Sequence, residues 1–153
     1  MKHIGNKQIL NNSLTAFLCS DKYSSKSVLL SYDWAVKMKN EKKCVISGFH
    51  SKLERDVLDI LLKGNSPIII ALGRCIYKNV PKKLVEHIRA NRLLIISEFD
   101  DSIIFPNKVT DEARNRKIIE MSDEVVIGHV NKGGMLDNIL KDIKKPLTIL
   151  DQE

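Results

Sequence analysis

Six short runs of apolar residues constrain the fold of this chain more than any other feature, because each run is continuous rather than alternating with polar residues. A continuous apolar run of this length is typical of a strand that is buried on both faces, as in the parallel sheets of α/β proteins. The runs therefore predict strands over residues 13–19, 44–48, 67–73, 93–98, 124–128 and 146–150.

The segments between these runs repeat apolar residues at helical spacing, for example at Leu53, Val57 and Leu61. Strands that alternate with helices are joined by right-handed crossovers into a parallel sheet. We therefore predict an α/β fold of the Rossmann-like, doubly wound class, with a mostly parallel sheet of about six strands and helices on both faces. The length of 153 residues fits a single domain over residues 1–153, with its core at about 14–150. The other segments with helical spacing contain Val28, Tyr32 and Ala35, then Leu84 and Ile88, then Met135, Leu136, Ile139, Leu140 and Ile143.

The sequence predicts a cytoplasmic protein without a membrane partner. No apolar stretch approaches the roughly 18 residues of a membrane span. Residues 1–10, MKHIGNKQIL, lack the apolar core of a signal peptide. Cys19, Cys44 and Cys75 are an odd number, widely spaced and in or beside apolar runs, which predicts buried reduced thiols and leaves no recognisable metal site.

The charge of the chain is positive, since 25 Lys and Arg outnumber 19 Asp and Glu for a formal net charge of +6. A basic surface favours polyanionic partners such as nucleic acids or nucleotides. Many basic proteins bind neither, so the charge is compatible with a nucleic-acid function without requiring one.

The loop after residues 44–48 is a candidate binding site, because ligands of doubly wound sheets bind beyond the carboxyl ends of the strands. It contains Ser47, Gly48, His50 and Ser51, and free amides at the start of the following helix could hold a phosphate. The same stretch also fits a capping box, with Ser51 as N-cap and Glu54 three residues later.

A second candidate loop contains Lys132, Gly133 and Gly134, just before an amphipathic helix. Two glycines would let a ligand phosphate approach the backbone, although the pair equally fits a flexible turn. The sequence has neither G-x-G-x-x-G nor a P-loop motif and so indicates no particular cofactor.

A third candidate loop follows the first predicted strand and offers Ser20 and Lys22 to an anion. Asp21 partly cancels the charge of Lys22, which weakens this interpretation. The alternative is that the hydroxyl-rich loop caps the next helix through Ser24 or Ser25.

The stretch 112–128, EARNRKIIEMSDEVVIG, places Arg114, Asn115 and Arg116 at the opening of a predicted helix. Residues one turn apart share a helix face, so Ile118 and Ile119 would pack on the sheet while the polar trio lies towards the N-terminal end of the helix. The alternative is that the arginines form surface ion pairs with Asp111, Glu112 or Glu120.

Glu98 is the one weak candidate for a catalytic group, because it ends a predicted buried strand. It could act as a general base or bind a ribose, or it could accept a hydrogen bond from a neighbouring loop. His50 has no nucleophile or second histidine that the sequence pairs with it.

Taken in order, these segments resemble the DNA-processing protein A (DprA/Smf) family of the DprA/LOG-like (SLOG) superfamily. VISGFHSKLE is similar to the family's VVSGLARGID, IIIALGRCIYKNVPKKLVEHI to its iAVLGcGldvvYPpeNraLaerI, and LLIISEF to its llSEyp. FPNKVTDEARNRKIIEMSDEVVIGHVNKGGML is similar to FPrRNRiIagLSdavvVvEa with a later SGSL, with an insertion between Pro106 and Arg114. The similar segments extend over residues 14–150.

The resemblance implies a domain that binds single-stranded DNA or a nucleotide, in DNA processing or uptake, rather than an enzyme. Phosphates would lie near Gly48, Gly133 and Gly134. Positive charge would come from Arg114, Arg116, Lys22 and Lys132.

The chain departs from the family pattern in its first loop, where Asp21 replaces an arginine. The loop NKGGMLDN also lacks the Thr and Glu of the P-G-G-x-G-T-x-x-E loop that LOG-like hydrolases use. Two alternatives follow the binding hypothesis: a nucleotide-processing hydrolase of the LOG-like type, using Glu98 and Arg114, and a non-catalytic scaffold that forms a homodimer.

Overall fold

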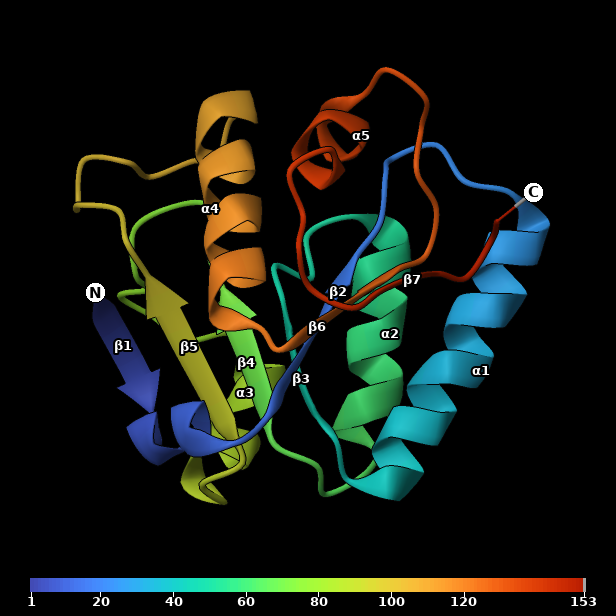
Figure 1. The fold of residues 1–153 in the computed structure, drawn as a ribbon. Helices are drawn as coiled ribbons and strands as arrows, with labels where there is room; N and C mark the ends of the chain where they lie inside the picture. Colours follow the sequence, from blue (N-terminus) through green and yellow to red (C-terminus); the bar gives the residue numbers. More distant parts are fainter. Residues whose placement is uncertain (153) are drawn as a thin grey trace.

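The structure is a computed structural model that describes residues 1–152. One sheet of seven strands forms its centre, in the order β1-β5-β4-β3-β2-β6-β7 (Figure 1). The chain runs through β1 (Lys2–Gly5), η1 (Lys7–Asn11), β2 (Leu14–Leu18), α1 (Ser25–Glu41), β3 (Cys44–Ser47), α2 (Lys52–Leu62), β4 (Ile68–Ala71), α3 (Lys82–Arg89), β5 (Leu93–Ser97), α4 (Lys108–Met121), β6 (Glu124–Ile127), α5 (Met135–Leu140) and β7 (Leu147–Ile149).

The predicted α/β class and the six predicted strands are confirmed, and the six strands pair in parallel. A seventh strand, β1, was not predicted and pairs antiparallel with β5 at the edge of the sheet. Its sequence, Lys-His-Ile-Gly, has a single aliphatic side chain, because an edge strand need not be apolar on both faces.

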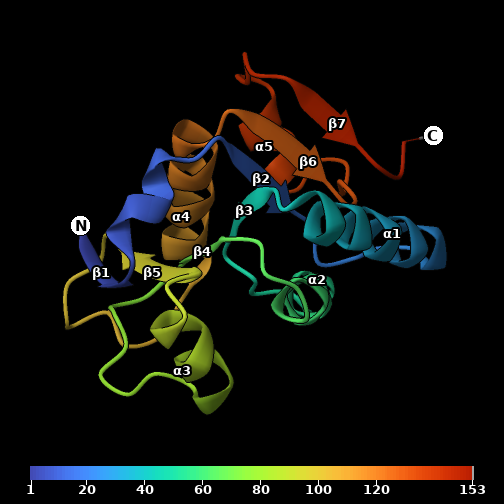
Figure 2. The same cartoon turned by 90° about the horizontal axis from the view of Figure 1, so that it is seen from below.

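Helices cover both faces of the sheet, as predicted (Figure 2). One core lies beneath α1, α2 and α3 and includes Phe17, Leu53 and Leu61, which are fully buried. The other lies beneath η1, α4 and α5 and includes Leu18 and Ile118. Successive strand residues point to opposite faces, so continuous apolar runs are needed to fill two cores at once.

The strand order reverses between β2 and β6. From β2 the chain adds β3, β4 and β5 on one side, and it then crosses back through α4 to add β6 and β7 on the other. The helices that follow β2 and β6, α1 and α5, cover opposite faces of the sheet, and a doubly wound sheet has its crevice at such a switch point of the carboxyl edge.

Helix α4 begins earlier than the sequence analysis predicted. Asn107 is its N-cap, and the Asn107 and Thr110 side chains form a reciprocal capping box. Arg114, Asn115 and Arg116 consequently lie in the middle of α4 and not at its opening. The residues inserted relative to the family pattern, 107–113, form the cap and the first turns of this helix.

Arg92 is a buried charged residue just before β5, with 9% of its surface exposed. Its guanidinium donates to the carbonyl oxygens of Leu61 (2.9 Å) and Leu62 (3.3 Å), the last residues of α2, and to that of Ser66 (2.8 Å). It also lies 2.8 Å from Nδ1 of His87 on α3. Arg92 therefore joins α2, α3 and β5 by hydrogen bonds to the carbonyl groups at the end of α2 and before β4.

The C-terminal segment lies beside the start of α1 (Figure 1), where Asp151 fixes it. The Asp151 carboxylate accepts hydrogen bonds from the hydroxyls of Ser24 (2.9 Å) and Ser27 (2.5 Å), and it lies 3.0 Å from Nδ1 of His129. Ser24 is also the N-cap of α1, which confirms the predicted capping role. These hydrogen bonds, above all the one from Ser27, lower the pKa of Asp151 to about 2.

The low pKa of Asp151 predicts a loss of stability in acid. The folded protein holds this carboxylate ionised below its ordinary pKa of 3.8, so its stabilising effect is complete above pH 3.8 and is lost as the pH falls towards 2. We expect Asp151→Asn to make urea midpoints less dependent on pH in this range, whereas Asp142→Asn, at an exposed position, keeps the wild-type dependence. Equal pH profiles for wild type and Asp151→Asn would contradict the assignment.

All three cysteines are free and buried, as predicted. Burial raises the pKa of Cys19 and of Cys44 to about 12, so both thiols stay protonated at neutral pH. Within residues 1–152, none of the helices combines the length and the apolar composition that a membrane crossing requires.

Candidate ligand site at the carboxyl edge of the sheet

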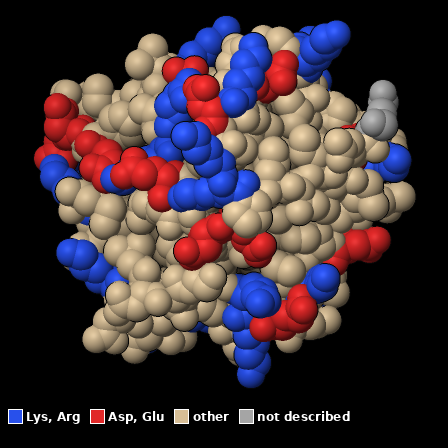
Figure 3. All heavy atoms as spheres, in the orientation of Figure 1, with Lys and Arg blue, Asp and Glu red and all other residues tan. Residues whose placement is uncertain are grey.

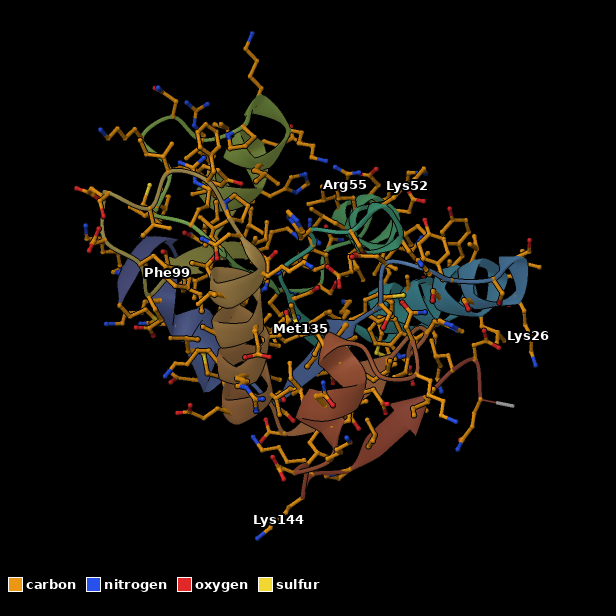
Figure 4. All side chains as sticks on the ribbon, turned by 90° about the horizontal axis from the view of Figure 1, so that it is seen from above. Lys26, Lys52, Arg55, Phe99, Met135 and Lys144 are labelled. Carbon is orange, nitrogen blue, oxygen red and sulfur yellow. The ribbon has the colours of Figure 1, made fainter. Side chains whose placement is uncertain are left out.

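A pocket of about 380 Å³ opens at the crevice where the strand order reverses. Its walls are the loop after β2, the start of α2, the first half of α4 and the turn into α5. Figure 4 looks down on this edge, with Met135 at the start of α5 between α4 and α2. The lining includes Cys19, Ser20, Asp21, His50, Ser51, Glu54, Lys108, Asp111, Arg114, Asn115, Asn131, Gly134, Met135 and Leu136.

Arg114 is the central cation of the pocket although only 7% of its surface is exposed. Its Nε donates to Oδ1 of Asn115 (2.9 Å) and its Nη2 to Oδ1 of Asp111 (3.2 Å). The guanidinium lies against Gly48, where an added β carbon would be 2.5 Å from Nη1. Within residues 1–152 no hydrogen bond engages Nη1.

Glu54 is a buried acid that organises the wall opposite α4. Its carboxylate accepts the backbone N–H groups of Cys19 (3.1 Å), His50 (2.9 Å) and Ser51 (3.3 Å). Burial raises the pKa of Glu54, against the opposing effect of these N–H donors and of Arg114. Glu54 thereby ties the end of β2 to the start of α2, and the capping box with Ser51 is confirmed.

The lining carries both signs of charge. Lys108 and Arg114 supply positive charge, and Asp21, Glu54 and Asp111 supply negative charge. Asp111 also lies 4.0 Å from Nε2 of the half-exposed His50. The pocket is therefore less basic than the sequence analysis implied, and a phosphate has a favourable position only near Lys108 and Arg114.

The structure brings six of the predicted ligand residues into the lining of the pocket and leaves six outside it. Those inside come from four separate loops and helices, as expected for a site at the strand ends. They are Ser20, His50, Ser51, Arg114, Asn115 and Gly134. Those outside are Lys22, Ser47, Gly48, Arg116, Lys132 and Gly133.

Helix geometry explains why the Arg-Asn-Arg cluster is divided. Successive helix residues are about 100° apart, so Arg116 points well away from Arg114. Arg116 is half-exposed, and its Nε lies 3.9 Å from the carboxylate of Glu112. Arg116 therefore forms the surface ion pair that was the alternative interpretation. Arg114 has an acidic partner too, Asp111, but it lines the pocket.

The amides of the glycine pair are not free, contrary to the expectation that they would hold a phosphate. The Gly133 N–H donates to the Asp137 carboxylate (2.8 Å), and the Gly134 N–H donates to the Asn131 carbonyl (3.0 Å). These two N–H groups are therefore engaged within the turn and are not free to hold an anion. The turn alternative is the better description of these residues.

Three other candidates have structural roles or lie elsewhere. Ser47 is buried, and its hydroxyl accepts the N–H of Phe49 (3.1 Å). The exposed Lys22 exchanges backbone hydrogen bonds with the Asn131 side chain. Glu98 lies outside the pocket lining, 3.8 Å from Nζ of Lys117.

Two lining residues were missed in the sequence. Lys108 was missed because α4 was expected to begin later, although the Asn107-x-x-Thr110 pattern of a capping box was a readable signal. Asn131 was missed because a single asparagine in a loop has no distinctive pattern; its side chain joins the loops after β2 and β6 through Lys22.

A doubly wound sheet of this kind defines a Rossmann-like α/β domain, and the pocket at its switch point is the candidate ligand site. The chain belongs to the DNA recombination-mediator protein A family, whose model matches residues 2–141. This match confirms the resemblance found in the sequence. No curated protein matches the chain.

Solved structures agree with this assignment at the level of the fold. DNA processing protein A from Helicobacter pylori, in a structure concerned with its single-stranded DNA binding mode, is 22% identical with a TM-score of 0.77 over 99% of this chain and 71% of that one. DprA from Streptococcus pneumoniae is 19% identical with a TM-score of 0.75, over 96% of this chain and 53% of that one. The molybdenum cofactor binding protein of Rippkaea orientalis is 15% identical with a TM-score of 0.60, over 90% and 76%.

Proposed function

We propose that this protein binds single-stranded DNA in the pocket at the carboxyl edge of its sheet, as part of DNA processing or uptake. A single nucleotide unit would occupy the pocket, so a free nucleotide is the minimal ligand. The proposal is supported by membership of the DNA recombination-mediator protein A family and by the similarity to the Helicobacter pylori protein.

The observation that carries the proposal is the position of Arg114. A guanidinium that is almost buried, held by Asp111 and Asn115 and still free at Nη1, is oriented in advance for an acceptor inside the pocket. Lys108 lines the same pocket and adds a second positive charge. A phosphate between these two side chains would satisfy the free N–H groups.

The rest of the lining suits a nucleoside better than a second phosphate. The Ser20 hydroxyl accepts the Asn131 N–H (2.9 Å) and keeps its own hydrogen for donation. Among the residues that the structure describes, the Asn115 amide nitrogen donates only to the sulfur of Met135, at 3.7 Å. Hydroxyl and amide donors beside the apolar Met135 and Leu136 can bind the edge and the face of a base or sugar.

Binding assays with a fluorescent oligothymidylate and with thymidine monophosphate test the proposal. We expect Arg114→Ala to weaken binding about tenfold or more, because a charged hydrogen bond contributes about 1.5–3 kcal/mol. Affinity should also fall as salt rises. Arg116→Ala, on the same helix but outside the pocket, is the matched control and should bind within twofold of the wild type, a bound of about 0.4 kcal/mol. No binding to either ligand at low salt would refute the proposal, as would equal losses in the two variants.

The two alternatives have less support. A hydrolase of the LOG-like type would need Glu98 near the ligand, whereas this residue lines a separate small cavity together with Phe99, Arg114 and Lys117. A homodimeric scaffold remains a prediction, which light scattering with and without oligonucleotide would test.

A further inference from the structure

A second cavity, of about 360 Å³, lies at the same edge of the sheet, between the loop after β4 and the loop after β5. The first loop contributes Arg74, Tyr77, Lys78 and Asn79, and the second contributes Asp101. The two loops are joined by the N–H of Cys75, which donates to the carbonyl of residue 103 (2.7 Å). The walls are therefore fixed relative to each other.

Arg74 is held in place by bonds that leave part of its guanidinium free. Its Nε donates to the carbonyl of Cys75 (3.1 Å), and its Nη2 lies 3.6 Å from the sulfur of the same residue. The guanidinium lies over the ring of Tyr77, 5.1 Å from the ring centre. An arginine stacked on an aromatic ring keeps its edge N–H groups available for bidentate contact with a phosphate.

The net charge of this cavity is more favourable to an anion than that of the first pocket. Arg74 and Lys78 provide two cations, and the single acid, Asp101, has Nζ of Lys2 at 2.9 Å. In the first pocket three acids face two cations. On the outer face seen in Figure 1, basic and acidic side chains are also intermixed over α4 and α5 (Figure 3).

The two cavities are neighbours through Gly73, which directly precedes Arg74 in the chain. A β carbon at Gly73 would lie 2.7 Å from Oδ1 of Asp111, 3.3 Å from Nη1 of Arg114 and 3.6 Å from Pro106. The short segment after β4 therefore connects the two cavities: Gly73 lies beside the guanidinium of Arg114 in the first, and Arg74 lines the second. A larger residue at this position would have to displace the Asp111 carboxylate, so glycine leaves the least obstruction between the two guanidinium groups.

We propose that the second cavity is a subsite for a backbone phosphate of the same single strand whose nucleotide occupies the first pocket. Arg74 and Lys78 bind the phosphodiester, and Asn79 offers an amide to the adjacent sugar or base. The inference rests on the proposed function, because it requires a strand that starts in the Arg114 pocket. A strand bound in this way spans the carboxyl edge from β2 to β5.

The experiment compares two ligands, a thymidine dinucleotide and an oligothymidylate of about 16 nucleotides, a length that covers the usual site of a single-strand binding fold. The double variant Arg74→Gln/Lys78→Gln removes both charges and keeps side chains of similar length. Lys43→Gln is the control for charge, because Lys43 is exposed and precedes β3 at the opposite edge of the sheet.

We expect the double variant to bind the long oligonucleotide about tenfold or more weakly at low salt, which corresponds to about 1.4 kcal/mol. The plot of log affinity against log salt should become less steep by roughly 0.7, since one neutralised phosphate on a single strand contributes about that much. The affinity of the double variant for the dinucleotide should stay within twofold of the wild type, a bound of about 0.4 kcal/mol. Lys43→Gln should bind both ligands within the same bound.

Two results would overturn the inference while leaving the proposed function intact: long-oligonucleotide binding by the double variant equal to that of the wild type, or equal losses for the long and short ligands. Failure of the wild type to bind either ligand would instead reject the proposed function and the subsite together. If the double variant unfolds at the same temperature as the wild type, misfolding is excluded as the cause of a loss of affinity.

Discussion

Gly48→Ala is expected to weaken oligonucleotide binding about tenfold or more while the protein stays folded. The new β carbon would lie 2.5–2.8 Å from Nη1, Cζ and Nε of Arg114, so the guanidinium must move. The obstructing atoms belong to the end of a side chain and not to the backbone, so the sheet itself need not shift. Anisotropy titrations together with urea denaturation measure the two effects separately.

A double-mutant cycle identifies the cause of this loss. If Gly48→Ala acts only by displacing Arg114, it has no further effect on affinity in an Arg114→Ala background. Additive losses in affinity would show that Gly48 contacts the ligand itself, in the way the sequence analysis first suggested. A loss of folding in Gly48→Ala would contradict the expectation that the displaced side chain can be accommodated.

Arg92→Ala is expected to produce the largest loss of stability among these variants, about 3 kcal/mol or more. The change removes the donor to the carbonyls of Leu61, Leu62 and Ser66 and leaves a cavity where the buried guanidinium was, although the Leu61 carbonyl still accepts the N–H of Gly64. Urea denaturation measures the change in the free energy of unfolding.

Arg89→Ala is the matched control, since Arg89 is exposed on α3 only three positions earlier in the sequence. A surface substitution of this kind should change the free energy of unfolding by less than about 0.5 kcal/mol. Similar values for the two arginine variants would mean that the hydrogen bonds of Arg92 contribute little to stability.

The strand pattern was predictable because burial on both faces of a parallel sheet leaves continuous apolar runs in the sequence. The edge strand β1 was not, since its residues Lys2 and His3 are exposed and its partner, β5, is about 90 residues away. Arg92 was equally hidden. The sequence does not show whether an arginine is buried or exposed. The carbonyl groups that accept the hydrogen bonds of Arg92 also lie 26 to 31 positions away in the sequence.

The candidate site was predictable in position and only partly in composition. The rule that ligands bind at strand ends pointed to loops that line the pocket, and the collinear resemblance singled out the cluster of Arg114, Asn115 and Arg116. The separation of Arg114 from Arg116 depended on where α4 begins and on its rotation, which the run of polar residues did not reveal. The closure of the Gly133 turn by Asp137 is a local hydrogen bond that a pair of glycines does not predict.

The reactivity of the buried cysteine thiols can be used to measure local opening of the structure. Cys19 lines the first pocket at the carboxyl end of β2, and Cys44 begins β3 at the opposite edge of the sheet. A maleimide or disulfide reagent can react only when a thiol reaches water and ionises, so the labelling rate of each cysteine measures how often its surroundings open. Ligand in the pocket should slow labelling of Cys19 more than that of Cys44, which makes thiol chemistry a probe of occupancy that needs no introduced label.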